Sequence, residues 1–133
     1  MSSTPHTAPR AQQRERHIPT AMVVEDEAII AMSLEDGLSD KGFQVVGPFS
    51  ACADALKALE STTPDLAIVD AVLSDGPCLE LARELRRRGV PFMIYSGAAA
   101  FDEHASELDG VPWVEKPSSF ETVLAAALGL LGR

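Results

Sequence analysis

Four polar features of this sequence each follow a short apolar segment, and together they have the chemistry needed for phosphoryl transfer. They are the pair Glu25-Asp26, then Asp70, Ser96 and Lys116. An aspartate is a nucleophile toward phosphoryl groups. A divalent cation and a lysine can neutralise the phosphoryl oxygens during the attack. The sequence therefore holds the side chains with which an aspartate accepts a phosphoryl group, provided that the fold brings them together.

The three acids also predict a metal site. Mg²⁺ prefers oxygen ligands in octahedral geometry and keeps several of its water molecules. We expect Asp26 to ligate the ion most directly, with Asp70 as the shared ligand and Glu25 acting through a water molecule. The backbone carbonyl of Val72, two residues after Asp70, would complete the ligands from the protein.

Lys116 and Ser96 are expected to hold the phosphoryl group itself. Lys116 would pair with Asp70 before the reaction and with a phosphoryl oxygen after it, while the Ser96 hydroxyl would hydrogen-bond another oxygen. Each feature also has a simpler interpretation: the acids 25–27 suit the positive end of a following helix, and the serine and lysine suit ordinary surface loops. Their joint occurrence at strand ends favours the functional interpretation.

The elements that must position these residues alternate regularly. Buried strands are predicted over 21–24, 43–46, 66–69, 91–95 and 112–114, each followed by a helical pattern. This alternation predicts an α/β fold, a (βα)5 flavodoxin-like doubly wound parallel sheet with strand order 2-1-3-4-5. With that order, the four strands that carry the polar features are contiguous, and the features meet at one edge of the sheet.

Several local signals refine the helices. Gly37 lies on the apolar face of the first helix, where it would allow close packing. Pro77 is expected in the first turn of the third helix, and Ser118 is expected to cap the last one. Ser50 is expected to cap the second helix. The helix over 101–108 has a thin apolar face and is the weakest of the five.

Composition restricts the class of protein. The 133 residues fit one domain, and 46% hydrophobic residues suffice for a core. Residues 1–19 lack apolar periodicity and are predicted to be a disordered tail before a domain over 20–133. A net charge of −9 argues against DNA binding, and no apolar run approaches the ~18 residues of a membrane span. Cys52 and Cys78 show no metal spacing, so reduced thiols and a cytoplasmic location are expected.

These motifs resemble a known family. Over roughly residues 20–131 the chain is similar to receiver domains of bacterial two-component response regulators. The similarity is carried by the segment 23–27, the strand before Asp70, the pairs 75–76 and 96–97, and Lys116-Pro117. The resemblance implies that Asp70 accepts a phosphoryl group from a phosphohistidine on a sensor histidine kinase or a histidine phosphotransfer protein. It also implies that Glu25 and Asp26 hold Mg²⁺, and that Ser96 and Lys116 engage the phosphoryl group.

The resemblance brings two further expectations and two departures. Receiver domains often carry a cis peptide bond at the position of Lys116-Pro117, and we expect one here. The aromatic switch position, three residues before the lysine, is Trp113, where the family usually has tyrosine or phenylalanine. The position after the Lys-Pro pair is Ser118, where the family often has phenylalanine. Pro91-Phe92 and the glycine after Ser96 also resemble single-domain regulators, which is a weaker resemblance.

The expected function is a phosphorylation-switched signalling protein, not an enzyme beyond its own phosphorylation and dephosphorylation. Since the sequence leaves no segment for an output domain, output is expected through an unknown partner protein or as a phosphate sink, from a monomer or weak dimer. One alternative is a degenerate receiver that acts unphosphorylated. A second is an aspartyl-phosphate phosphatase-like enzyme, which would need an acid where Val72 stands. A third is a flavin-binding module, whose phosphate the acids 25–27 would repel.

Overall fold

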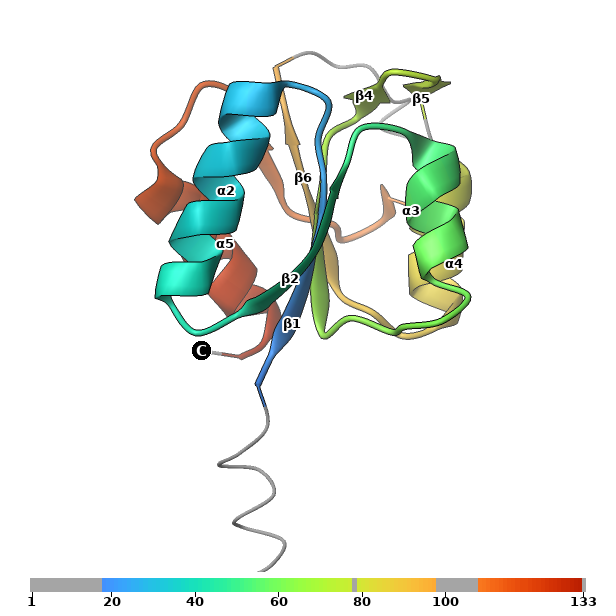
Figure 1. Ribbon diagram of the computed structural model, residues 1–133, viewed down its shortest axis with the longest axis horizontal. Helices are drawn as coiled ribbons and strands as arrows, with labels where there is room; N and C mark the ends of the chain where they lie inside the picture. The colour runs from blue at the N-terminus through green and yellow to red at the C-terminus, as the bar shows by residue number, and fades with distance from the viewer. Residues whose placement is uncertain (1–17, 78, 98–107, 133) are drawn as a thin grey trace, which may run out of the picture.

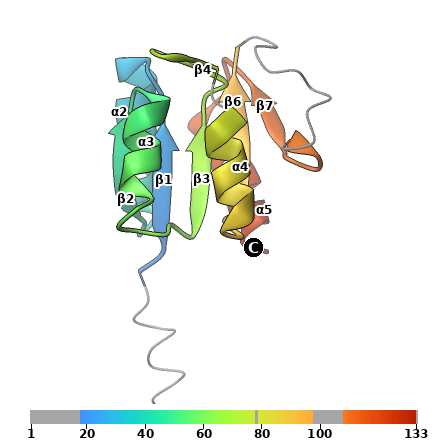
Figure 2. The same ribbon diagram turned by 90° about the vertical axis from the view of Figure 1, so that its right-hand side faces the viewer.

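A five-stranded parallel sheet forms the centre of the molecule in the computed structural model, which describes residues 18–77, 79–97 and 108–132. The strand order is β2-β1-β3-β6-β7 (Figure 2), so the predicted order 2-1-3-4-5 is confirmed, with β6 and β7 as the fourth and fifth strands. Nearly all of the predicted tail lies outside the described residues. The sheet strands are β1 (Thr20–Val24), β2 (Gln44–Phe49), β3 (Leu66–Val69), β6 (Phe92–Ser96) and β7 (Trp113–Glu115).

Helices cover both faces of the sheet, as a doubly wound fold requires. Figures 1 and 2 show α2 and α5 on one face and α3 and α4 on the other. Most of the helix expected over 101–108 lies outside the described residues, so that expectation stays a prediction. The helices in the described part of the chain are α2 (Ala28–Asp40), α3 (Cys52–Ala58), α4 (Leu79–Arg87) and α5 (Phe120–Leu130).

The two strands that lead to the acids, β1 and β3, are deeply buried. All four residues of β3, and residues 21–24 of β1, are at most 2% exposed, because both faces of these strands are covered by helices. Side chains on one face of the sheet pack with α3 and α4, and those on the other face pack with α2 and α5. β7 differs, since it is an edge strand and both of its ends are exposed.

Gly37 confirms the close packing expected from the sequence. A Cβ atom at this position would collide with the ring of Phe120 from α5. Because glycine has no side chain, the ring of Phe120 rests against the backbone of α2 and brings the two helices together. This contact ties the last helix to the element that follows Glu25 and Asp26.

The segment after Asp70 departs from the prediction. Val72–Leu73 (β4) and Gly76–Pro77 (β5) pair as a two-stranded antiparallel hairpin. The expectation that Pro77 opens a helix is therefore wrong, and α4 begins at Leu79. A strand of two residues has no period that a sequence pattern can reveal, so a turn was the natural interpretation. β2 likewise runs on to Phe49, past Gly47-Pro48, where the prediction ended it at residue 46.

Two predicted helix caps are also wrong. The N-cap of α5 is Ser119, which accepts a hydrogen bond from the Thr122 amide, whereas the Ser118 hydroxyl donates to the Glu115 carbonyl. The two adjacent serines are equally good caps by type, so the sequence alone could not separate them. Ser50 makes no cap either, since the N-cap of α3 is Ala51 and lacks a side-chain bond.

The start of α3 is instead held by the hairpin. The Asp75 carboxylate accepts hydrogen bonds from the Cys52 and Ala53 amides. The pKa of Asp75 is lowered, and the bond from the Cys52 amide is the largest cause. The Ser74 amide and hydroxyl both donate to the Ser50 carbonyl. The hairpin after Asp70 is thus fastened to the neighbouring loop.

Cys52 corrects another expectation. It is disulfide-bonded in the structure, so the prediction of a reduced thiol is wrong at this position.

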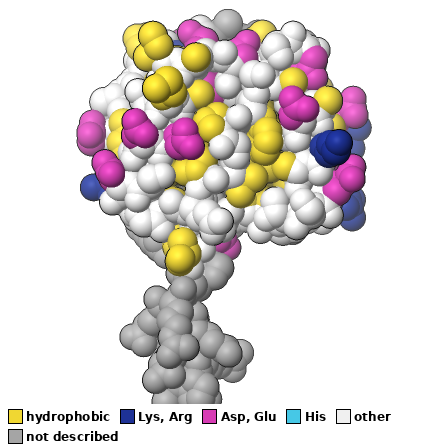
Figure 3. Space-filling model, viewed as in Figure 1, with side chains coloured by type: hydrophobic (Ala, Val, Ile, Leu, Met, Phe, Trp, Pro, Cys, Tyr) yellow, Lys and Arg dark blue, Asp and Glu magenta, His cyan; other side chains and the backbone are white. Residues whose placement is uncertain are grey.

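Exposed apolar side chains gather at the start of α2. Figure 3 shows hydrophobic side chains at the upper left of this face, over the first turns of α2. Ile29 and Met32 of that helix are 81% and 61% exposed. No helix in the described part of the chain is long and apolar enough to cross a membrane.

Candidate functional site

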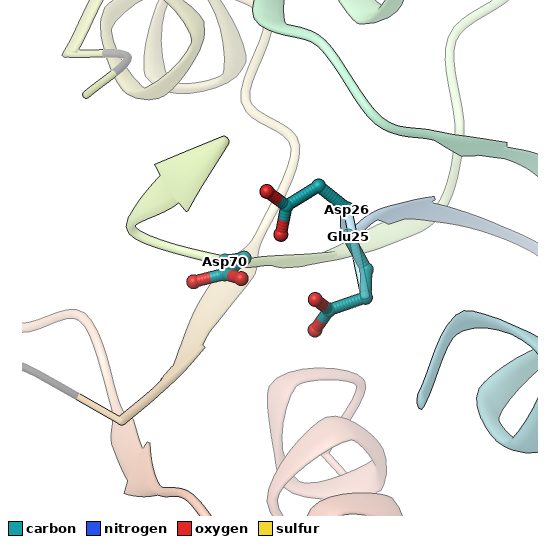
Figure 4. A group of neighbouring side chains, drawn as sticks. All are labelled: Glu25, Asp26 and Asp70. Carbon is teal, nitrogen blue, oxygen red and sulfur yellow. The ribbon is translucent and has the colours of Figure 1, made fainter. Parts of the chain in front are cut away.

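The three predicted metal-binding acids meet at the carboxyl end of the sheet. β1 and β3 are neighbours with Val24 opposite Val69, so the residues that follow them leave the sheet side by side. The Asp70 amide donates to the Val24 carbonyl at 2.8 Å, which fixes this register. Glu25, Asp26 and Asp70 each offer a carboxylate oxygen within 4.8 Å of the others. Figure 4 shows the three carboxylates grouped at the ends of the two strands.

Burial divides the acids into two kinds. Glu25 and Asp70 are 3% and 5% exposed, whereas Asp26 is exposed. The buried carboxylates are satisfied by the backbone as well as by Lys116: Glu25 accepts from the Glu27 amide and Asp70 accepts from the Val72 amide. Two acids are therefore fixed in place, and Asp26 is the one open to solvent.

Lys116 is the counter-charge of this cluster. It follows β7, and its amide donates to the Ser96 carbonyl of β6. Its Nζ lies 2.9 Å from Glu25 Oε1, 3.0 Å from Asp70 Oδ2 and 2.6 Å from Glu27 Oε2. The predicted pairing of Lys116 with Asp70 is thus seen in the geometry, and the Lys116-Pro117 bond is cis, as expected.

The electrostatics follow from crowding and burial. Burial raises the pKa of Glu25 to about 7, and the bond from Lys116 only partly opposes this effect. Burial disfavours the ammonium of Lys116, but its hydrogen bonds to Glu27, Glu25 and Asp70 outweigh burial and hold its pKa above the usual range. The site therefore has more acid than base, an arrangement that favours binding of a further cation.

The donor set fits Mg²⁺. Three carboxylates from two adjacent strand ends supply hard oxygen ligands on one side, and the exposed Asp26 leaves the other side open to water and a phosphoryl group. Val72 lines the cavity beside these acids. Which of these acids ligates the ion directly and which acts through a water molecule stays a prediction.

A cavity of about 560 Å³ joins the acids to the lysine. Ser96, at the end of β6, is 7% exposed and lines it together with Lys116. Trp113 is not among the described residues that line this cavity; it lies on β7, opposite Ile94, and is 38% exposed. The structure therefore brings five of the predicted side chains together and places Trp113 outside the group.

Two residues near the site were missed by the sequence analysis. Glu27 was given no role of its own among the acids 25–27, yet it makes the shortest of the three contacts with Lys116. The sequence predicted Tyr95 only as a residue of a strand. In the structure its hydroxyl donates to the Ser118 carbonyl and accepts from the Ser118 amide. The centre of its ring lies 5.6 Å from Lys116 Nζ. The sequence held one signal for both: Glu27 directly follows Asp26, and Tyr95 directly precedes Ser96.

Comparison with known proteins gives a consistent result. A family model described as the response regulator receiver domain matches residues 21–128. A response regulator receiver protein from Sinorhizobium medicae has a solved structure that superposes with a TM-score of 0.78 at 27% identity, covering 87% of this chain and 96% of that one.

Curated relatives are longer than this chain. The transcriptional regulatory protein PdtaR of Mycobacterium tuberculosis is 27% identical over 108 residues, which are 79% of this chain and 53% of that protein. The response regulator MprA of Mycobacterium ulcerans is 28% identical over 116 residues, or 84% of this chain and 50% of that protein. The chain therefore spans about half the length of the curated relatives that it matches.

Proposed function

The chain belongs to the response regulator receiver domain family, and on that premise we propose that it is a phosphorylation-switched signalling protein with Asp70 as its phosphoacceptor. One observation carries the proposal. The Asp70 carboxylate lies 3.0 Å from the Lys116 amine and within 4.8 Å of two further acids, at the carboxyl end of a buried strand. The proposed nucleophile, its counter-charge and the acids that would hold a cation thus lie close together.

The proposed reaction is a direct transfer. A carboxylate oxygen of Asp70 attacks phosphorus, the bond between phosphorus and the donor histidine nitrogen breaks, and the histidine leaves with the electron pair. Asp26 and Asp70, with Glu25 through water and the Val72 carbonyl, would hold Mg²⁺. When bound, this ion would neutralise phosphoryl oxygens. Lys116 would pair with one phosphoryl oxygen and Ser96 would donate its hydroxyl to another.

The proposed donor is a sensor histidine kinase or a histidine phosphotransfer protein. A groove of about 180 Å³ between α2 and α5 is lined by Ile29, Leu34 and Phe120, among others, and lies on the helix that follows the acids. With Met32 exposed beside Ile29, this surface suits an apolar helix of a partner. The donor histidine would then approach Asp70 from a docked protein.

The output is proposed to be an interaction with another protein, or removal of phosphate from a shared kinase, by a monomer or weak dimer without DNA or membrane contact. The protein would act as a phosphoacceptor, with no catalytic activity beyond its own phosphorylation and dephosphorylation. We propose a cytoplasmic location, where a disulfide at Cys52 would form only transiently.

Labelling by a small phosphodonor tests the assignment. With Mg²⁺ and acetyl phosphate, intact-mass spectrometry should show a gain of about 80 Da on the wild-type protein, the mass of one phosphoryl group. Asp70→Asn should gain nothing, whereas Asp36→Asn, which changes an exposed acid on α2, should be labelled like wild type. Equal labelling of wild type and Asp70→Asn would refute the assignment. An unlabelled wild-type protein would favour the degenerate receiver.

A further inference from the structure

Glu27 makes a contact that the proposed phosphoacceptor chemistry does not use. Its Oε2 lies 2.6 Å from Lys116 Nζ, closer than Glu25 or Asp70 comes to the same amine. Its side chain is 60% exposed, whereas those of Glu25 and Asp70 are 2% and 6% exposed. An exposed carboxylate has no need of a partner for its solvation, so this contact calls for a separate explanation.

The position of Glu27 places its charge at the mouth of the cavity. Glu27 lines the same cavity as Asp70, Ser96 and Lys116. The Glu27 amide donates to the Glu25 carboxylate at 2.9 Å. The Glu27 carbonyl accepts the first helical hydrogen bond of α2, from the Ala31 amide. The backbone is therefore fixed on both sides, and only the exposed side chain is free to turn toward Lys116 or away from it.

An arriving phosphoryl group needs the amine that Glu27 occupies. The ammonium of Lys116 has three N–H donors, and in this structure its contacts are with Glu25, Glu27 and Asp70. A phosphoryl oxygen that pairs with Lys116 must replace one of these carboxylates. While the donor arrives, and before the Asp70 carboxylate has reacted, Glu25 and Asp70 stay buried and held by backbone amides, so Glu27 is the partner that yields at this stage.

We propose that Glu27 is a positioning and specificity-determining residue that competes with the phosphoryl group for Lys116. The inference rests on the proposed function of Asp70. Before transfer, Glu27 occupies the lysine and keeps a negative charge at the entrance, which repels free anionic phosphodonors. A docked partner protein can offset this repulsion through its own contacts, whereas a small donor cannot. Glu27 therefore selects a protein phosphodonor over a small anionic one.

The test compares phosphorylation by acetyl phosphate in wild type, Glu27→Gln and the matched variant Asp36→Asn. In each transfer the bond from phosphorus to the acetate oxygen breaks, and acetate leaves with the electron pair. Glu27→Gln keeps the size of the side chain and removes its charge. A unit charge a few ångström from a dianion in water should change the labelling rate about three- to tenfold. We expect faster labelling at low donor concentration, with a lower half-saturating concentration, and wild-type rates for Asp36→Asn.

A second readout needs neither metal nor phosphodonor. In metal-free buffer, the side-chain ammonium resonance of Lys116, assigned by its absence in Lys116→Arg, should shift in Glu27→Gln and stay unchanged in Asp36→Asn. A displaced resonance together with faster labelling supports the competition. Labelling of Glu27→Gln at or below the wild-type rate, while wild type itself is labelled, overturns the role of Glu27 and leaves Asp70 as phosphoacceptor. Absence of labelling in both wild type and Glu27→Gln overturns the proposed function and this inference with it.

Discussion

The half of the site that comes from β1 and β3 differs from the half that comes from β7. On β1 and β3, the acids follow strands buried on both faces, and backbone amides hold Glu25 and Asp70. Lys116 instead follows β7, a short edge strand exposed at both ends. Its amide donates to the Ser96 carbonyl, and its side chain is held by ion pairs to the acids, while the Tyr95 hydroxyl bonds the nearby Ser118.

This difference indicates how the two halves share the work. A ligand set must be preorganised to bind a cation tightly, and rigid buried strands provide that. A segment held by few contacts changes conformation at lower cost, because it has less packing to lose. We therefore expect the acid half to bind and the lysine half to respond, and three measurements test this division.

The largest effect is expected from Asp26→Asn, which removes the exposed acid of the rigid half. At a Mg²⁺ concentration about 100 times its dissociation constant, binding should stabilise the wild-type fold by about 2.7 kcal/mol. This gain is measured as the rise in melting temperature when Mg²⁺ is added. Asp26→Asn should show only a small part of that rise. Without Mg²⁺ the variant should be at least as stable as wild type, because one charge of a repelling cluster is gone.

Asp36→Asn serves as the control, since it removes an exposed acid of α2 that lies outside the cluster. It should keep the full wild-type response to Mg²⁺. If Asp26→Asn responds to Mg²⁺ as wild type does, Asp26 is not a ligand and the acid half has been assigned the wrong role.

A smaller effect is expected from Tyr95→Phe, which loosens the lysine half alone. The change removes the hydroxyl that bonds both backbone groups of Ser118 and keeps the buried ring beside Lys116. Loss of these bonds should lower the free energy of unfolding by about 1 to 2 kcal/mol, measured by urea denaturation. The gain in melting temperature with Mg²⁺ should stay at the wild-type value. A reduced Mg²⁺ response would show that the two halves are not separable.

The same division explains what could be predicted from the sequence. The strands before Glu25 and Asp70 are continuous apolar runs, a strong local signal, and their order brought the acids together correctly. The β4–β5 hairpin was missed because its strands are two residues long and its stability comes from bonds to another loop. The role of Glu27 was missed because an ion pair across 89 residues leaves no periodic pattern in the sequence.

The smallest effect, and the one that tests the responding half most directly, is expected in the fluorescence of Trp113. The indole lies on β7 and is 38% exposed, so its emission should be sensitive to its surroundings. Phosphorylated Asp70 would place oxygens near the Ser96 hydroxyl. Ser96 lies opposite Glu115 and Ile94 lies opposite Trp113 in the same strand pair, so a shift of β6 reaches the indole through the backbone ladder.

We expect the emission of the only tryptophan in the chain to change when wild type is phosphorylated with Mg²⁺ and acetyl phosphate. Ser96→Ala removes the hydroxyl but not the strand pairing, so it should still gain the phosphoryl mass and lose most of the fluorescence change. Asp70→Asn, treated identically, reports any direct effect of the donor on the indole. If the mass of wild type shows that it is phosphorylated but its emission stays constant, the response lies outside β7. An equal change in Ser96→Ala would mean that the signal reaches Trp113 without Ser96, through Lys116 and the chain that joins it to β7, and that the lysine alone couples the two halves.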